Sequence, residues 1–356
     1  MQITDRIKNE ILTPNDLDAI IVSDPYNFRY LSGSDAEGAL LITKEKAHLY
    51  TDSRYTIAAK ASAGASGFLI HEFTSKNPMK KMVADDAAGL HNIGYEDLFL
   101  TVNEFGKFKE ALPNAELIPL DTTLNDLRMV KTPEETALLE QAERIGDLAF
   151  ESIIPLIKPG ITELSLAAEI EYAMKRNGAE GFSFETIVAS GLNSACPHHR
   201  PTERPLEKGD FVTMDFGCIY RGYCSDMTRT VVLGKANDKQ KEVYETVRRA
   251  QEAGLSALKP GLTGKQIDEV SRNIIKEAGY GEYFGHGLGH SVGLYIHEDP
   301  RLSPSEERVI KEGYIETVEP GIYIEGFGGV RIEDMCVVTK DGARSLTHSP
   351  KELMEL

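Results

Sequence analysis

Hydrophobic residues in the first third of the chain occur in short runs that are separated by turn residues. Four of these runs have the length and composition of β-strands, and they cover residues 18–22, 39–43, 47–51 and 67–71. Helical stretches such as residues 76–88 fall among the runs. The alternation predicts a small α/β domain. We find no catalytic constellation in this part of the sequence.

The hydrophobic period changes near residue 132, where a long helix is predicted to begin. Thr132 supplies a capping hydroxyl, Pro133 suits the first helical position, and Glu135 stands three residues after the cap. Apolar residues then follow at helical spacing, at Leu138, Ala142, Ile145, Ala149 and Ile153. We therefore place a boundary between residues 125 and 132, with one domain at 1–126 and a second at 127–356.

The second domain contains an internal repeat. The segment KPGIT at residues 158–162 recurs as KPGLT at residues 259–263, which is 101 residues later. Each copy lies between two amphipathic helical patterns, and the second helix of each pair ends at a glycine, Gly178 or Gly279. An apolar strand that carries an acidic residue follows each copy. The repeat predicts two related αβ halves about a pseudo-twofold axis, with sites where the halves meet.

The strand of the first half spans residues 208–217 and alternates between apolar and polar residues. Successive side chains of a strand point to opposite faces, so Asp215 lies on the face away from the apolar residues. A second strand follows the turn at residues 220–222. A hairpin centred between residues 220 and 221 predicts that Asp215 lies opposite Asp226, and Thr213 opposite Thr228.

The second half has the same design. Residues 314–319 and 329–333 flank a glycine-rich turn, and Glu319 and Glu333 are symmetric about Gly326. Pro320 cannot donate to a central ladder, so a bulge or a strand end is expected there. Four carboxylates that face one another destabilise a fold unless their pKa values rise or cations bind. Strand pattern alone leaves open that the four acids are separate and solvated.

A histidine-rich segment favours the clustered interpretation. His286, His290 and His297 lie within twelve residues that are rich in glycine. Imidazole is a common neutral metal ligand and a general acid or base near neutral pH. Glycine lets the backbone approach a ligand closely. The segment therefore predicts a metal or catalytic site.

Composition sets limits on the function. A chain of 356 residues favours two domains, and its net charge of −17 opposes binding to nucleic acid or to an anionic membrane surface. No apolar run approaches the roughly 20 residues of a membrane span, and the N-terminus lacks a secretory pattern, so we expect a cytoplasmic protein. The four cysteines form no C-x-x-C pair and predict reduced thiols.

Together these residues resemble the signature of the pita-bread metallopeptidases. The resemblance rests on Asp215, on Asp226 eleven residues later, and on the segments HGLGH at 286–290, VEPG at 318–321 and VRIED at 330–334. Within this family the chain is similar to the Xaa-Pro peptidases, prolidase and aminopeptidase P. The resemblance covers the whole chain. It implies an α+β architecture, in which a small creatinase-like α/β domain precedes a pseudo-twofold pita-bread domain.

The resemblance also implies a role for each site residue. The implied metal ligands are Asp215, Asp226, His290, Glu319 and Glu333. The implied substrate-side residues are His198, His286, His297 and Arg301. Arg331, two residues before Glu333 on the same strand face, is expected to orient that carboxylate, with an ordinary surface ion pair as the alternative.

Two divalent metal ions are the implied cofactors. Four oxygen ligands and one imidazole suit Mn²⁺, with Co²⁺ and Zn²⁺ as alternatives. Glu319 is the expected proton shuttle to the leaving nitrogen, and His297 is expected to stabilise the oxyanion. Family members are commonly dimers, so we expect a homodimer.

Two activities on Xaa-Pro peptides fit this signature. A dipeptidase must neutralise the free carboxylate of its substrate, and Arg301 is the candidate for that contact. Aminopeptidase P, which releases the N-terminal residue of longer peptides, is the alternative. Methionine aminopeptidases resemble only the second domain. A creatinase-like relative or a metal-free pita-bread binding protein should lack some ligands, and none is missing. We therefore expect an Xaa-Pro dipeptidase.

Overall fold

The computed structural model describes residues 3–356 and divides the chain into two compact units on either side of the Arg128–Met129 bond. Each unit has its own hydrophobic clusters. None of the helices among the described residues is long and apolar enough to cross a membrane.

Unit 1 is built on a six-stranded sheet in the order β4-β3-β2-β1-β5-β6. Its strands are β1 (Ala19–Val22), β2 (Gly38–Thr43), β3 (Ala47–Thr51), β4 (Leu69–Glu72), β5 (Asn92–Tyr95) and β6 (Glu116–Pro119). Its helices are α1 (Ile3–Ile7), the π-helical turn η1 (Lys8–Leu12), α2 (Pro25–Ser32), α3 (Thr56–Ala61), α4 (Met79–Asp86), α5 (Val102–Ala111) and α6 (Thr123–Asp126). The strands alternate their apolar side chains between two clusters, one on each face of the sheet.

The hydrophobic pattern predicts this sheet well. Three of the expected strands are found within one residue at each end, and the fourth is displaced to Leu69–Glu72. The helix expected over residues 76–88 is shorter, because Pro78 occupies the N-cap and α4 ends at Asp86. The chain then turns at Gly89, whose φ of +85° suits glycine.

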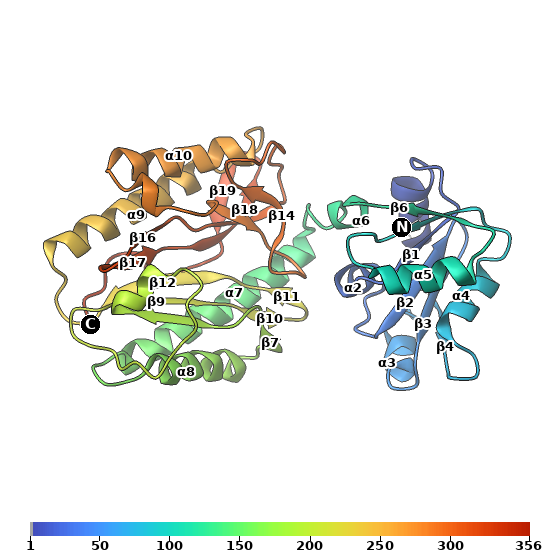
Figure 1. Ribbon diagram of the computed structural model, residues 1–356, viewed down its shortest axis with the longest axis horizontal. Coiled ribbons are helices and arrows are strands. Elements are labelled where there is room, and N and C mark those ends of the chain that lie inside the picture. The colour runs from blue at the N-terminus through green and yellow to red at the C-terminus, as the bar shows by residue number, and fades with distance from the viewer. Residues whose placement is uncertain (1–2) are drawn as a thin grey trace. The chain divides into compact units, whose positions relative to one another are not determined.

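Unit 2 contains two pairs of helices that lie on opposite sides of a central layer of strands (Figure 1). The pairs are α7 (Pro133–Ile153) with α8 (Glu163–Arg176), and α9 (Asp238–Ala257) with α10 (Gly264–Glu277). Short 3-10 turns occur at η2 (Ile154–Leu156), η3 (Gly191–Ala195) and η4 (Gly281–Tyr283). The capping box predicted at Thr132 is present and begins α7.

The internal repeat predicted from the sequence is confirmed by the helix ends. Thr162 caps α8 and Thr263 caps α10, each by accepting a hydrogen bond from the third residue of its helix. Gly160 and Gly261, in the two copies of the repeated motif, have the same φ of +94°. The two motifs therefore share a backbone conformation as well as a sequence.

The strands of unit 2 form four small sheets, in the orders β12-β9-β8, β11-β10-β7, β14-β13-β15-β18-β19 and β16-β17. In the first half the strands are β7 (Gly181–Phe182), β8 (Ile187–Ser190), β9 (Phe211–Phe216), β10 (Cys218–Tyr220), β11 (Tyr223–Cys224) and β12 (Met227–Val232). In the second half they are β13 (Gly289–Ser291), β14 (Glu298–Leu302), β15 (Ile315–Val318), β16 (Gly321–Ile324), β17 (Gly328–Arg331), β18 (Asp334–Thr339) and β19 (Gly342–Ser345).

The register predicted for the first hairpin is wrong by two residues. Asp215 pairs with Thr228, and Thr213 pairs with Thr230 rather than with Thr228. The turn consists of Arg221 and Gly222, which both have positive φ as a two-residue hairpin turn requires. A shift of two residues preserves the face of each side chain. Asp215 and Asp226 are therefore near neighbours on one face, although they are not a direct pair.

The symmetry predicted for the second hairpin is confirmed. Val318 pairs with Asp334 in one sheet, and Gly321 pairs with Arg331 in the next, so both ladders are symmetric about Gly326. The ladder stops between Val318 and Gly321, where Pro320 was expected to end a strand. Glu319 and Glu333 occupy this interruption, and their side chains are free to turn towards the first hairpin.

Candidate metal centre

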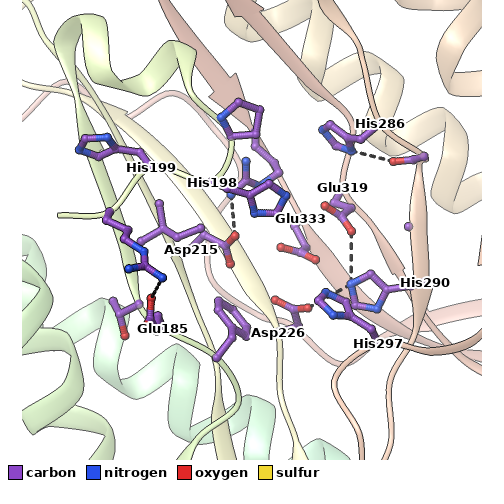
Figure 2. Close-up of a pocket in the computed structure, with 18 of the residues that line it drawn as sticks. Glu185, His198, His199, Asp215, Asp226, His286, His290, His297, Glu319 and Glu333 are labelled. Atoms are coloured by element: carbon purple, nitrogen blue, oxygen red, sulfur yellow. Dashed lines mark hydrogen bonds and ion pairs between the residues drawn. The ribbon is translucent and has the colours of Figure 1, made fainter.

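Acidic side chains from both hairpins meet in a cavity of about 560 Å³ in unit 2. The ten residues singled out from the sequence as site residues all line this cavity. Figure 2 shows Asp215, Asp226, Glu319 and Glu333 with their carboxylates turned towards one another. The interpretation of these residues as separate, solvated acids is therefore wrong.

His290 lies beside two of the four carboxylates. Its Nε2 atom is 3.4 Å from Oδ2 of Asp226 and 3.4 Å from Oε1 of Glu319. One ligand atom each of Asp226, His290 and Glu333 lie within 4.8 Å of one another. All three side chains are buried. This spacing allows several of these atoms to contact the same cation.

Three carboxyl groups of this cluster, those of Asp226, Glu319 and Glu333, have raised pKa values and so resist ionisation. Burial raises the pKa of Asp226 well above its usual range, and the neighbouring Glu333 and Asp215 raise it further. Burial, Glu319 and Asp215 do the same for the pKa of Glu333. Burial raises the pKa of Glu319 to about 7, although Arg331 opposes the change. Two divalent cations would offset this accumulation of negative charge.

His286, His290 and His297 favour the neutral form of imidazole. Burial, followed by the proximity of His297, lowers the pKa of His290 to about 3. Burial, followed by the proximity of Arg331, lowers the pKa of His286 to about 4. The pKa of His297 is also lowered, by burial and by Arg301. Neutral imidazole is the form that binds a metal.

The residues present fit a pair of divalent metal ions. Oδ1 of Asp215 is buried and has no hydrogen-bond partner among the described residues, which would be costly without a further ligand. The cluster offers four carboxylates and one imidazole, a set that suits Mn²⁺, Co²⁺ or Zn²⁺ better than a soft metal. Asp215, Asp226, His290, Glu319 and Glu333 are the side chains that can hold these ions.

A hydrogen-bonded group links the two hairpins beneath the acids. Arg331 donates to Oδ2 of Asp215 at 2.5 Å, to the Thr228 hydroxyl at 3.0 Å and to the Tyr323 hydroxyl at 2.8 Å. Thr228 donates in turn to Oε2 of Glu333 at 2.7 Å. Arg331 is therefore buried and is not an ordinary surface ion pair. It contacts Asp215 directly and reaches Glu333 through Thr228, a link that the sequence did not reveal.

Three of the predicted substrate-side residues come from the second half. His286 lies 3.0 Å from the Tyr323 hydroxyl, and His297 packs edge-on against His290 with ring centroids 4.7 Å apart. Arg301 follows on β14, where its backbone pairs with that of His290. The Arg301 side chain is 42% exposed and contacts Asp299 at 3.6 Å. A cation at the wall of the cavity is thus accessible to a substrate.

The fourth, His198, lies on a loop that a buried glutamate holds in place. Glu163, at the first turn of α8, is fully buried and accepts hydrogen bonds of 2.7–3.1 Å from Ser190, Asn193, His199 and Thr202. Burial alone would raise the pKa of Glu163, but these donors lower it to about 2. Sequence reasoning missed Glu163 and His199, and the adjacent pair His198-His199 was the available signal.

Comparisons with known proteins agree with this geometry. The model of metallopeptidase family M24 matches residues 137–340, and the model of the creatinase/prolidase N-terminal domain matches residues 6–130. The chain is 40% identical to the Xaa-Pro dipeptidase of Pyrococcus horikoshii over 97% of both chains.

Solved structures show the same likeness. The structure of an Xaa-Pro dipeptidase from Bacillus anthracis has a TM-score of 0.95 and 42% identity, covering 100% of this chain and 99% of that one. An X-Pro aminopeptidase from Thermotoga maritima has a TM-score of 0.91 and 35% identity over 99% of each chain. The protein with this metal-binding cluster therefore belongs to metallopeptidase family M24 and carries a creatinase/prolidase N-terminal domain.

Proposed function

We propose that the protein is an Xaa-Pro dipeptidase that hydrolyses the bond before proline with two divalent metal ions. The observation that carries the proposal is the convergence of four carboxylates and one neutral imidazole on a cavity of about 560 Å³, a size that suits a peptide ligand. Family membership and the Xaa-Pro dipeptidases among its relatives support the same activity.

In this proposal each hairpin supplies two of the five metal ligands. Asp215 and Asp226 come from the first hairpin, and Glu319 and Glu333 from the second, while His290 completes one site. When bound, the ions acidify a water molecule and polarise the scissile carbonyl. Arg331 contributes by fixing the carboxylate of Asp215 through a charge-assisted hydrogen bond.

The remaining side chains act on the substrate. His297 stands next to His290 and can donate a hydrogen bond to the carbonyl oxygen as negative charge develops there. Glu319 accepts the proton of the attacking water and passes it to the leaving nitrogen. Proline has no hydrogen on its nitrogen within a peptide bond, so this proton transfer is essential to its departure. His198 and His286 line the cavity and contact the peptide.

Arg301 favours the dipeptidase over aminopeptidase P. A dipeptide of the Xaa-Pro class ends in a carboxylate one residue beyond the scissile bond, and that charge requires a partner. Arg301 lines the cavity and is only weakly engaged by Asp299. Aminopeptidase P remains the alternative, since the likeness to the Thermotoga enzyme extends over the whole chain.

Arg301→Ala separates the two activities. We expect kcat/KM for Xaa-Pro dipeptides to fall about 10- to 100-fold, the scale of a lost charge-assisted hydrogen bond, and kcat/KM for Xaa-Pro-Xaa peptides to change little. Arg308→Ala is the matched control, because Arg308 also pairs with Asp299 and is similarly exposed. Equal losses on both peptide lengths contradict the dipeptidase, and cleavage of a methionyl tripeptide contradicts both proline-directed activities.

Three finer features belong to the same proposal. Mn²⁺ is the proposed ion because four of the five ligands are oxygen donors, and metal analysis of protein purified without chelator tests it. A cytoplasmic location is supported by the cysteines, all four of which are free and three of which are buried. A homodimer is proposed from the resemblance to the family, and sedimentation measurements test it.

A further inference from the structure

Unit 1 holds a second group of side chains that could hold a metal ion, away from the peptidase motifs in the sequence. His48 lies on β3, His71 on the neighbouring strand β4, and Asp86 at the end of α4. Nδ1 of His48 is 3.0 Å from Nε2 of His71. Oδ2 of Asp86 is 3.5 Å from the first nitrogen and 3.9 Å from the second. Three donor atoms from three elements thus lie within 4.8 Å of one another.

The spacing of these atoms matches a transition-metal ion. A point equidistant from the three donor atoms lies about 2.0 Å from each, which is the length of a bond from Zn²⁺ to imidazole nitrogen or carboxylate oxygen. Hydrogen bonds alone account for the group less well. Oδ2 of Asp86 is too far from either ring nitrogen for a normal hydrogen bond. One hydrogen bond joins the two rings, which also stack with centroids 5.1 Å apart.

Neighbouring side chains hold His71 and Asp86 in position. The Tyr50 hydroxyl donates to Oδ2 of Asp86 at 2.8 Å, and the Tyr50 ring stacks on His71 with centroids 4.9 Å apart. Such partners fix the orientation of metal ligands. His48 is buried, and burial lowers its pKa, which favours the neutral, ligating form. His71 and Asp86 are 25% and 30% exposed, so solvent can fill a remaining coordination position.

We propose that His48, His71 and Asp86 form a binding site for Zn²⁺ or a similar transition-metal ion, separate from the peptidase centre. Two imidazoles and one carboxylate are a ligand set that zinc accepts. The ion would join β4, which is the edge strand of the sheet, to helix α4. Its effect is to hold this edge of unit 1 together and not to assist peptide hydrolysis.

Anomalous diffraction from crystals of the full chain soaked in Zn²⁺ tests the site by position. We expect a peak between His48, His71 and Asp86, recorded above the zinc edge and absent below it. Peaks confined to the cavity of unit 2 overturn the proposal. Because the two positions are resolved independently, failure here is distinguishable from failure of the proposed peptidase centre.

Zinc stoichiometry provides a second test on the full chain. We expect His71→Ala and Asp86→Asn each to bind one equivalent of Zn²⁺ fewer than the wild type in equilibrium dialysis. His91→Ala is the matched control, because His91 is an exposed histidine of the same unit. Circular dichroism checks that the variants are folded. Equal zinc content in the wild type and both ligand variants contradicts the site.

Discussion

Two groups of buried carboxylates in unit 2 have opposite electrostatic character. The acids of the cavity face other acids, and burial with like charge raises the pKa values of Asp226 and Glu333. Glu163 is at least as buried, yet hydrogen-bond donors surround both its oxygens and lower its pKa to about 2. The difference shows that burial alone does not determine the state of a carboxylate. Donors supplied by the chain complete one group, and the other requires cations.

Removing one acid of the cavity should have the largest effect. In Asp226→Asn we expect loss of at least one metal equivalent and a fall in turnover of about a thousandfold or more, the scale of losing a preorganised electrostatic element. Atomic absorption and steady-state kinetics measure the two quantities. Asp238→Asn is the matched control, since Asp238 is exposed at the start of α9. If Asp226→Asn kept its full metal content, the cavity acids would not depend on cations, and their contrast with Glu163 would be lost.

Replacing Glu163 should have an intermediate effect that leaves the metals in place. Glu163→Gln turns one acceptor oxygen into a donor, so part of the loop that carries His198 loses its anchor. We expect kcat to fall about 10- to 100-fold, the range for residues that hydrogen-bond to site residues and orient them. The metal content should be unchanged. Glu169→Gln, on the exposed face of the same helix, is the control. Loss of metal in Glu163→Gln would mean that Glu163 supports the acids directly.

The pH dependence of Glu163 sharpens the same comparison. Its folded pKa of about 2 lies below the ordinary value of 4.5, so the ionised form stabilises the native state above pH 4.5. This contribution is lost as the pH falls towards 2. The raised pKa values of the cavity acids work in the opposite direction. Acid unfolding of metal-free wild type and Glu163→Gln, followed by circular dichroism, should show a smaller loss of stability in the variant.

Glu96 in unit 1 is a third case. Burial raises its pKa to about 7, although the backbone amides of Ser23 and Asp24 and the Asn27 side chain donate to it. The native state therefore holds a proton more tightly than the unfolded chain. The contribution of Glu96 to the free energy of unfolding should fall by roughly 3 kcal/mol as the pH rises from 4.5 to 7.

Glu96→Gln should remove this pH dependence from unit 1. Hydrogen exchange of the β1 and α2 amides, corrected for intrinsic rates, reports opening of these elements in the full chain. The wild type should lose protection between about pH 5 and about pH 8, and the variant should not. The same loss in both proteins would show that the three donors already outweigh burial, as they do at Glu163.

The sequence predicted the shared face of Asp215 and Asp226 but not the register of their hairpin. Side-chain alternation fixes the face at a period of two, so Asp215 and Asp226 were placed correctly on one face despite the error of two residues. That error arose at Arg221, because a non-glycine residue with positive φ is not apparent from sequence. In the second hairpin Pro320 marks the strand end, and there the prediction was correct.

The supporting residues were harder to predict because their partners are distant in sequence. Glu163 follows a capping threonine and looks like an ordinary acidic residue at a helix start. Its donors Ser190, Asn193 and Thr202 lie 27 to 39 residues away, and no local pattern indicates that the loop returns. Thr228 likewise reads as a β-branched strand residue, and its contacts with Arg331 and Glu333 appear only in the fold.

The two hairpins are related by a pseudo-twofold axis. A peptide therefore meets a similar arrangement of acids whichever of its ends enters the cavity first. The carboxylates therefore cannot by themselves distinguish the amino end of a substrate from its carboxyl end. The polarity of the bound peptide has to come from groups that the repeat does not duplicate. His286, His297 and Arg301 line the cavity from the second half, and in the proposed function they break this symmetry and fix the direction in which the peptide binds.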